Sequence, residues 1–321
     1  MWDILPHTLY HWYRNHLSDY QNDITQCKWP QNSMLKVDET TGEVLENKPV
    51  YIFKPNNLGE KMSIDDKNIG GEGYTILSNT QTGKIAMMIE SVKKNELENA
   101  MALFGRNILK IRSISLDMSA TYLSVCREQM PDAEIVIDKF HVMQYLYDAV
   151  LHVRSRIKNE LAENLTKGKE KTDEDKKILY QIELLNRCRY RLMQSPDKWS
   201  ENGKEVMNLV FTNHQELKVI YNLSQDFKKW YDKGNCSKNK TAIKDELHNW
   251  YKRVIETDIK EIKSVIKMIR KHESEIINYF SSGHTSAKAE RINGKIKRFI
   301  SANFGVKDRD FVLYRIAGYF S

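Results

Sequence analysis

Short apolar runs separated by turn residues dominate the segment from residue 59 to residue 140. Three of these runs are rich in Ile, Met and Thr, and glycines at 70, 71, 73 and 83 lie in the gaps between them. This pattern predicts three antiparallel strands joined by tight turns. The predicted strands are Lys61–Asp66, Tyr74–Asn79 and Lys84–Ser91.

Helical and extended patterns alternate after the third strand. Leu97, Met101 and Phe104 have the spacing of one helix face, and the following runs continue in the same alternation. The predicted elements are a helix at Lys94–Phe104, a strand at Ile111–Asp117, a helix at Ala120–Gln129 and a strand at Glu134–Asp138. Three strands followed by helix, strand, helix and strand predict an α/β fold, a mixed sheet with helices packed on it. RNase H-like nucleases have this order.

The segment before residue 59 has weaker patterning. His7–Tyr20 is predicted to be an amphipathic helix rich in aromatic residues, which we expect to pack on the rest of the domain. Residues 28–58 are polar and contain three prolines, so they are predicted to be a loop with one edge strand at Val50–Phe53.

From residue 140 to residue 279 the periodicity is helical throughout, beginning with one long helix at Val142–Leu161. Aromatic residues spread through this segment favour core anchors over base-stacking side chains. Helices at Ser286–Ile300 and Asp308–Phe320 end the chain. We therefore divide it into a lead-in (1–58), a first part of an α/β core (59–140), an all-helical segment (141–283) and helices that complete the core (284–321).

Composition adds limited information about partners and compartment. The chain has 50 Lys and Arg against 43 Asp and Glu, and this net charge of +7 fits either a polyanionic partner or a merely basic protein. The four cysteines lack the close spacing of a zinc site or a disulfide framework, so we expect a reduced, cytoplasmic compartment. There is no signal-peptide pattern and no apolar run near the roughly 20 residues that span a bilayer.

Two carboxylates at predicted strand ends suggest phosphodiester chemistry. Such chemistry is served by two Mg²⁺ ions about 3.5–4 Å apart, which prefer oxygen ligands. Asp65 falls near the end of the first predicted strand and Asp117 ends the fourth, and these strands are neighbours in RNase H-like topology. Asp66 points to the opposite sheet face because side chains alternate along a strand.

A third carboxylate is expected from the helix Ser286–Ile300. Its predicted buried stripe places Glu290 at the margin, and Gly294 leaves room one turn further on; the stripe comprises Ala289, Ile292, Ile296 and Phe299. These acids also have an ordinary structural interpretation. An Asp at a strand end commonly caps a turn, and a Glu among cations commonly forms ion pairs.

Three blocks resemble a known family. They read MSIDDKNIGGEGYTILSN, ISLDMSATYLSVCREQMPDAEIVIDKFHVMQYLYDAV and TSAKAERINGKIKRF. Together they resemble the DDE transposases of bacterial insertion sequences, in the family often called ISL-three. The similarity extends to WDILPHTLYHWYRNHLSDYQ and SPDKW, and points to a subgroup with two reading frames, in which a separate upstream protein carries a DNA-binding region. The resemblance implies an RNase H-like fold with a large all-helical insertion before the catalytic Glu.

The resemblance also implies a catalytic set. It places the two catalytic aspartates at Asp65 and Asp117 and the glutamate at Glu290, holding two Mg²⁺ ions or Mn²⁺ in their place. The family's usual I-D-E is here Ile64-Asp65-Asp66, and its S-A-E-S-F-N-like run is here AKAERIN at residues 287–293. These departures retain the three carboxylates and leave activity to be tested.

Two further features flank this set. Asp138 and His141 match the family's D-x-F-H, which suggests support of the site; the alternative is that Asp138 caps the following helix and His141 packs in its first turn. Five cations on the helix of Glu290 suggest phosphate contacts, with a solvated basic face as the alternative. They are Lys288, Arg291, Lys295, Lys297 and Arg298.

The function implied is metal-dependent cleavage at the ends of an insertion sequence, followed by transfer of the 3′-hydroxyl ends into target DNA. The expected partners are the terminal repeats, the target DNA, a separately encoded DNA-binding protein and a second copy of the chain, acting at the bacterial nucleoid. Two alternatives are a catalytically inactive, transposase-derived DNA-binding protein and an RNase H-like nuclease that cuts without joining.

Overall fold

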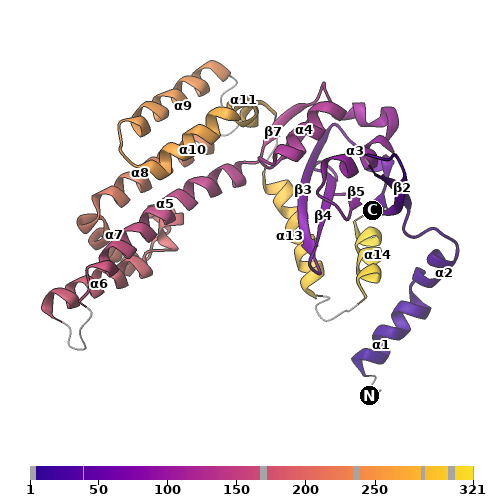
Figure 1. Ribbon diagram of the computed structural model, residues 1–321, viewed down its shortest axis with the longest axis horizontal. Coiled ribbons are helices and arrows are strands. Elements are labelled where there is room, and N and C mark those ends of the chain that lie inside the picture. Colours follow the sequence, from indigo (N-terminus) through magenta and orange to yellow (C-terminus); the bar gives the residue numbers. More distant parts are fainter. Residues whose placement is uncertain are drawn as a thin grey trace. The chain divides into compact units, whose positions relative to one another are not determined.

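The computed structural model describes residues 5–38, 40–166, 172–233, 239–282, 286–302 and 308–320. The chain forms two compact units (Figure 1). The sheet unit comprises residues 1–138 and 282–321, and the helical unit comprises residues 139–281. Within the described ranges, no helix combines the length and apolar character needed to cross a lipid bilayer.

In the described part of the chain, one mixed sheet of seven strands forms the centre of the sheet unit, in the order β1-β2-β5-β4-β3-β6-β7. β3 pairs in parallel with β6, and β6 with β7, while the other pairings are antiparallel. The strands are β1 (Asn32–Val37), β2 (Val44–Phe53), β3 (Lys61–Ile69), β4 (Glu72–Asn79), β5 (Ile85–Ile89), β6 (Ser113–Leu116) and β7 (Glu134–Ile137). The α/β mixed sheet expected from the sequence is confirmed.

Helices cover both faces of this sheet. On one face, Ile64 and Leu116 pack in a core with residues of α3 (Lys94–Ala102) and α4 (Ala120–Gln129). On the other face, Ile76 and Met88 pack with residues of α13 (Ser286–Ala302) and α14 (Arg309–Tyr319). The alternation of apolar side chains along the strands therefore supplies two separate cores, and the second one depends on the C-terminal 40 residues.

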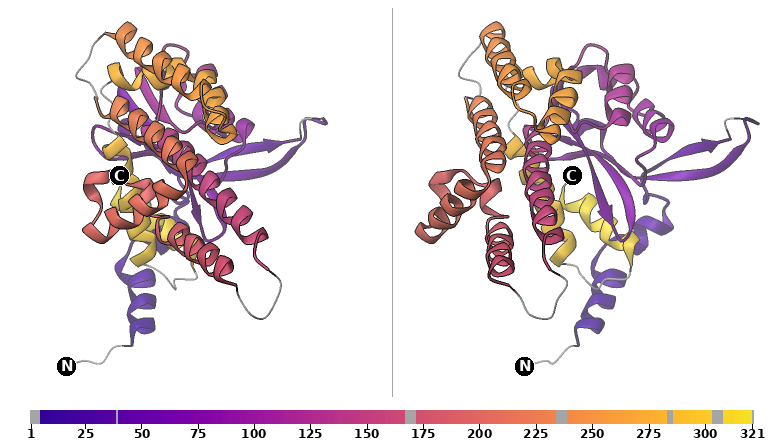
Figure 2. Two further views of the ribbon diagram at one scale, coloured as in Figure 1. Left: turned by 90° about the vertical axis from the view of Figure 1, so that its left-hand side faces the viewer. Right: turned by 60° about the vertical axis from the view of Figure 1, so that its left-hand side comes forward.

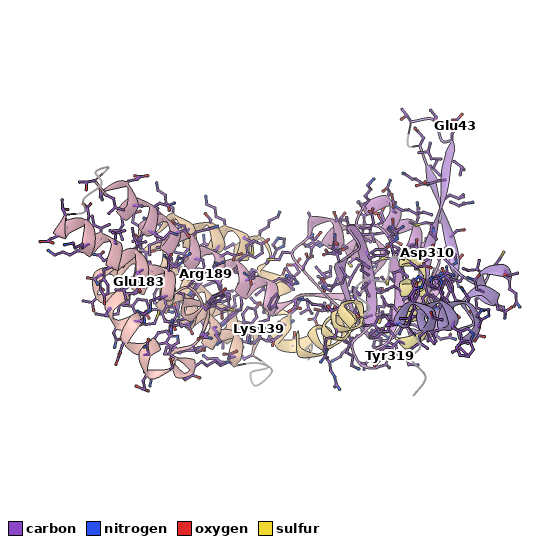
Figure 3. All side chains as sticks on the ribbon, turned by 90° about the horizontal axis from the view of Figure 1, so that it is seen from below. Glu43, Lys139, Glu183, Arg189, Asp310 and Tyr319 are labelled. Carbon is purple, nitrogen blue, oxygen red and sulfur yellow. The ribbon has the colours of Figure 1, made fainter. Side chains whose placement is uncertain are left out.

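The prediction of a loop over most of residues 28–58 is wrong. β1 and β2 form an antiparallel hairpin that extends beyond the other strands (Figure 2), with Glu43 at its end (Figure 3). Its turn is stabilised by Asp38, whose Oδ1 accepts hydrogen bonds from the backbone of Thr40 and Thr41, and by Gly42 at φ 71°. The outer half of the hairpin is exposed on both faces, so no apolar alternation marks it in the sequence.

The predicted N-terminal helix is divided into three segments. They are α1 (Pro6–Trp12), a π-helical turn (Tyr13–Leu17) and α2 (Tyr20–Thr25). The ring of Tyr20 is buried and lies 5.0 Å from that of Phe311 in α14. Tyr10 and Tyr13 each have ring centroids 5.9 Å from the same Phe311. The aromatic side chains therefore attach this segment to the sheet unit.

The helical unit is built on α5, a helix of 25 residues. Its helices are α5 (Lys139–Glu163), α6 (Asp173–Arg187), α7 (Glu201–Asn213), α8 (Gln215–Asp232), α9 (Lys240–Ile255), α10 (Lys260–Lys271) and α11 (Glu273–Ile277), and α12 (Tyr279–Ser282) follows them. Phe227, Trp230 and Trp250 are buried between α8 and α9, and the indole of Trp250 donates a hydrogen bond of 2.9 Å to the carbonyl of Leu223. These aromatic residues are core anchors, as their distribution predicted.

Candidate active site

β3, β6 and β7 are neighbouring parallel strands; β6 and β7 end at one edge of the sheet, while β3 continues past them to Ile69, beyond the predicted end at Asp66. In the register of β3 with β6, Ser63 lies opposite Ser115. Asp65 and Asp117 come two residues later in each strand's direction, so continuing the register brings them side by side. Adjacent strands are about 4.8 Å apart. The two aspartates expected from the sequence are therefore neighbours across this edge.

Asp65 and Asp117 belong to the sheet face that α13 and α14 cover. Ile64 and Leu116, the residues just before them, lie in the core on the α3–α4 face. Because side chains alternate along a strand, the two carboxylates point to the other side. Asp66 is exposed on the α3–α4 side, so the structure separates Asp65 from its acidic neighbour.

Hydrogen bonds orient both carboxylates. Asp65 accepts a bond of 2.9 Å from the backbone N–H of Asp66 and pairs with Lys67 Nζ at 2.7 Å. Asp117 accepts a bond of 2.9 Å from the backbone N–H of Ser119, directly before α4. The side chain of Asp65 is 17% exposed, so a ligand can reach it while the strand holds it in place.

Lys67 was not among the residues expected at this site. It lies two positions after Asp65 on the same strand, which brings both side chains to one face. Its ammonium, 27% exposed, balances the charge of Asp65. The i, i+2 spacing of opposite charges on a strand is the signal in the sequence that could have identified it.

Asp138 continues the same row of acids. Its N–H donates a hydrogen bond of 2.8 Å to the carbonyl of Leu116, and the register of β6 with β7 places it next to Asp117. Asp138 also directly precedes α5, in whose first turn the half-buried ring of His141 lies 5.6 Å from Phe140. Its two expected roles, support of the site and a cap on the following helix, stay predictions.

α13 packs on the face that carries the two aspartates. Ile292 and Ile296 are buried in that core and Phe299 packs against it, as the predicted stripe requires. The side chains of Ala289, Glu290 and Lys288 lie outside the described residues. The other four expected cations on α13 are exposed; they are Arg291, Lys295, Lys297 and Arg298.

Tyr122 in α4 responds to burial and to the nearby acids. Burial raises the pKa of Tyr122 in α4, a hydrogen bond with Thr75 lowers it, and the negative charges of Asp66, Asp117 and Asp65 raise it further. The hydroxyl oxygens of Tyr122 and Thr75 lie 3.1 Å apart. The net effect raises the pKa of Tyr122 and keeps its phenol protonated beside the aspartates.

The donor set suits a hard divalent cation. Two half-buried carboxylates, one within β3 and one directly after the adjacent β6, offer the oxygen ligands that Mg²⁺ and Mn²⁺ prefer. Among the residues whose side chains the structure describes, no group of three or more His, Cys, Asp or Glu is arranged to hold a metal ion. α13, the helix that contains position 290, packs on the same sheet face as the two aspartates.

Similarity to known proteins agrees with this arrangement. A family model of transposases, the ISL3 family of DDE transposases, matches residues 62–316. The "Transposase for insertion sequence element IS1001" from Bordetella parapertussis is 19% identical over 213 residues, which cover 66% of this chain and 48% of that protein. The chain thus spans about half the length of this relative. No solved structure matches the chain.

The family match covers most of the chain, including both strand-end aspartates and α13. Both aspartates of the candidate site lie within the matched range. The chain belongs to the ISL3 family of DDE transposases.

Proposed function

We propose that the chain is the catalytic subunit of an insertion-sequence transposase, which cuts DNA at the ends of the element and joins the freed 3′-hydroxyl groups to target DNA. The observation that carries this proposal is the register of β3 with β6, which makes Asp65 and Asp117 neighbours on the face covered by α13. Membership in the family supports it. The strand order β5-β4-β3-β6-β7 agrees with an RNase H-like core, to which β1 and β2 are added.

Asp65, Asp117 and Glu290 would hold the divalent metal ions, two Mg²⁺ or Mn²⁺. When bound, these ions activate the attacking oxygen and stabilise charge on the leaving oxygen of an in-line displacement. The chain's own contribution is to fix the ligands: the backbone N–H of Ser119 orients Asp117, and that of Asp66 orients Asp65. Lys67 neutralises Asp65 before binding and, once displaced, has an ammonium free to contact a phosphate.

The cations of α13 would position the DNA at this edge. Arg291, Lys295 and Lys297 are exposed on the helix that also carries Glu290, and Arg298 bonds back to the carbonyl of Gly294 at 3.3 Å. A Cβ at Gly294 would have no described atom within 4 Å. Phosphates could approach the helix backbone there, and Lys288 would extend the same set.

The remaining assignments follow from this role. The helical unit would be the insertion that separates the second aspartate from the glutamate in the chain. The DNA partners would be the terminal repeats and the target, with a separately encoded protein to recognise the repeats. Two ends must be brought together for joining, so a homodimer is the expected assembly.

Replacement of Asp117 by Asn tests the proposal. The variant keeps the size of the side chain and loses its charge, so cleavage and joining of labelled ends with Mg²⁺ should fall by about 10³-fold or more. DNA binding, measured by fluorescence anisotropy with EDTA, should change less than about twofold. Asp132→Asn removes an exposed carboxylate elsewhere in the sheet unit and should leave both activities intact.

The same assay separates the alternatives. If Asp117→Asn still cuts and joins, the assigned site is wrong. Wild-type protein that binds but never cuts would be an inactive transposase-derived protein. Supplying pre-cut ends detects joining alone, and an RNase H-like nuclease would give no joined product.

A further inference from the structure

The positive charge of the chain belongs to the helical unit. Residues 139–281 contain 28 Lys and Arg against 21 Asp and Glu, whereas the sheet unit contains 22 of each. The entire net charge of +7 therefore lies in the unit without the candidate active site. A polyanion is attracted to a net positive surface, so the helical unit is the part of the chain that electrostatics favours for binding one.

α10 concentrates cations on one face. Its positively charged residues follow the spacing three, four, three and one, which keeps them on one side of a helix. They are Lys260, Lys263, Lys267, Arg270 and Lys271. The opposite side is buried in the core of the unit through Ile262, Val265, Ile266 and Ile269. We call the five cations the α10 stripe.

Most of the α10 stripe has no acidic partner. In the part of the chain that the structure describes, only Lys263 of the five pairs with a carboxylate, that of the fully exposed Asp258 at 3.2 Å. Arg270 lies over the ring of Tyr251, 4.9 Å from its centroid. Like charges three or four residues apart destabilise a helix by about 0.2–0.5 kcal/mol per pair, so the stripe is repulsive until an anion covers it.

Other cations of the helical unit behave differently. Lys176, Lys204 and Lys233 are exposed and lie within 2.7–2.8 Å of a carboxylate. Lys176 lies in α6, Lys204 lies in α7 and Lys233 directly follows α8. The net charge alone therefore does not produce the α10 stripe; the local absence of acids on that helix face does.

We propose that the α10 stripe binds the phosphate backbone of duplex DNA, as a DNA surface of the helical unit in addition to the candidate active site of the sheet unit. This inference rests on the proposed function for the identity of the polyanion. At about 1.5 Å per residue, Lys260 to Lys271 span about 16 Å, enough to follow several phosphates spaced about 3.4 Å along each strand. Lysine ammoniums supply charge without reading base edges, so the surface binds without sequence preference.

A membrane surface fits the α10 stripe less well. Amphipathic helices that bind lipid headgroups insert an apolar face between the acyl chains. The apolar face of α10 is already buried inside the unit, with Ile262 and Ile269 fully covered. The exposed side carries the five cations and the polar Ser264, with Met268 half-buried, and this mainly charged surface suits a backbone of phosphates.

The test compares two triple variants of the full chain with equal loss of charge. One is Lys260→Gln, Lys267→Gln, Lys271→Gln in the α10 stripe, and the control is Lys176→Gln, Lys204→Gln, Lys233→Gln. Binding to a fluorescent 30-base-pair duplex is measured in EDTA over a range of salt concentrations. The stripe variant should bind about tenfold more weakly, with a salt slope smaller by about 0.9 per lost contact, while the control stays within about twofold of wild type.

Each outcome is decisive. Equal weakening of DNA binding in both variants would mean that only net charge matters, which would overturn the proposal. Unchanged DNA binding by the stripe variant would overturn it as well. Thermal unfolding checks that both variants fold, and binding of wild type to phosphatidylserine vesicles in preference to DNA would assign the stripe to lipid instead. The measurement uses no metal, so it holds or fails independently of cleavage by Asp117.

Discussion

The sheet unit and the helical unit divide the properties that a DNA-processing enzyme needs. The sheet unit has balanced charge and places its acids by strand register, so that Asp65 and Asp117 become neighbours although 52 positions separate them in the chain. The helical unit carries the excess positive charge and displays it on a helix face, through residues close together in sequence. Chemistry depends on long-range order, whereas attraction to DNA requires only local periodicity.

This difference has a consequence for substitutions. A single change at Asp65 or Asp117 should abolish the proposed turnover, because no neighbouring residue can replace a ligand of the proposed metal ions. A single change in the α10 stripe should have a small effect, because several charges share the contact. The two units should therefore differ in how steeply function responds to one substitution.

The largest expected effect compares adjacent acids in β3. Asp65→Asn should lower cleavage by about 10³-fold or more, while Asp66→Asn should change it less than about fivefold, because Asp66 points to the opposite face. Gel assays of labelled ends with Mg²⁺ measure both rates. Similar losses of cleavage rate in the two variants would mean that the sheet face to which each side chain points does not decide which aspartate acts at the site.

A core substitution tests whether the two units unfold separately. Phe227 is 1% exposed and contacts the rings of Trp230 and Trp250. Phe227→Ala should destabilise the helical unit by about 3–5 kcal/mol through loss of buried area and a new cavity. One buried cysteine in each unit reports the result: burial raises the pKa of Cys126 to about 12 and that of Cys188 to about 11, although nearby Arg154 lowers the latter.

These thiols should react with iodoacetamide only when their unit opens, since alkylation needs an accessible thiolate. In Phe227→Ala, labelling of Cys188 should accelerate at least about a hundredfold, and labelling of Cys126 should change less than about threefold. Mass spectrometry of peptides separates the two sites, with the exposed Cys27 as an internal standard. Equal acceleration at both cysteines would show one cooperative molecule.

A smaller effect concerns the attachment of the β1–β2 hairpin to α3. Burial of Glu96 raises its pKa, but the hydrogen bond and charge of Lys48, 2.6 Å away, outweigh this and hold the pKa below its usual range. A carboxyl with a lowered pKa stabilises the fold above its unfolded pKa of about 4.3, and the contribution is lost as pH falls through the folded pKa.

Lys48→Met should therefore cost about 2 kcal/mol at pH 7, where it leaves the buried charge of Glu96 with only the hydrogen bond of Ser91 and the charge of Lys93. The loss should shrink toward pH 4, because Glu96 then takes up a proton. Urea unfolding at several pH values measures both trends. Lys36→Met breaks an exposed pair with Glu46 on the same hairpin and should cost less than about 0.5 kcal/mol at any pH.

Sequence patterns predicted the sheet unit unevenly. The strands from β3 to β7 alternate between two buried faces, so their apolar periodicity is strong and their approximate positions follow from it. The strand predicted at Val50–Phe53 is the buried end of β2, but β1 and the outer part of β2 were missed because side chains such as Leu35 and Val44 are exposed, which leaves no buried face to detect. Its hydrogen bonds come from pairing between strands, which local composition does not reveal.

The candidate site shows the same limit. Strand ends and parity indicated Asp65 and Asp117, but their adjacency depends on the parallel register of β3 with β6. The roles of Glu290, Asp138 and His141 remain predictions. Lys67 was overlooked because an ion pair along a strand resembles ordinary surface charge until the structure shows it beside the acid.

The second core of the sheet unit sets an order of events during synthesis. The face bearing Tyr74, Ile76 and Met88 is covered by α13 and α14, which leave the ribosome roughly 10–40 s after β7 at ordinary elongation rates. Until then the nascent chain exposes an apolar sheet face and lacks position 290. The sheet unit therefore cannot complete its second core before its last helices are made, and until then the uncovered apolar face makes the unfinished chain a substrate for chaperones.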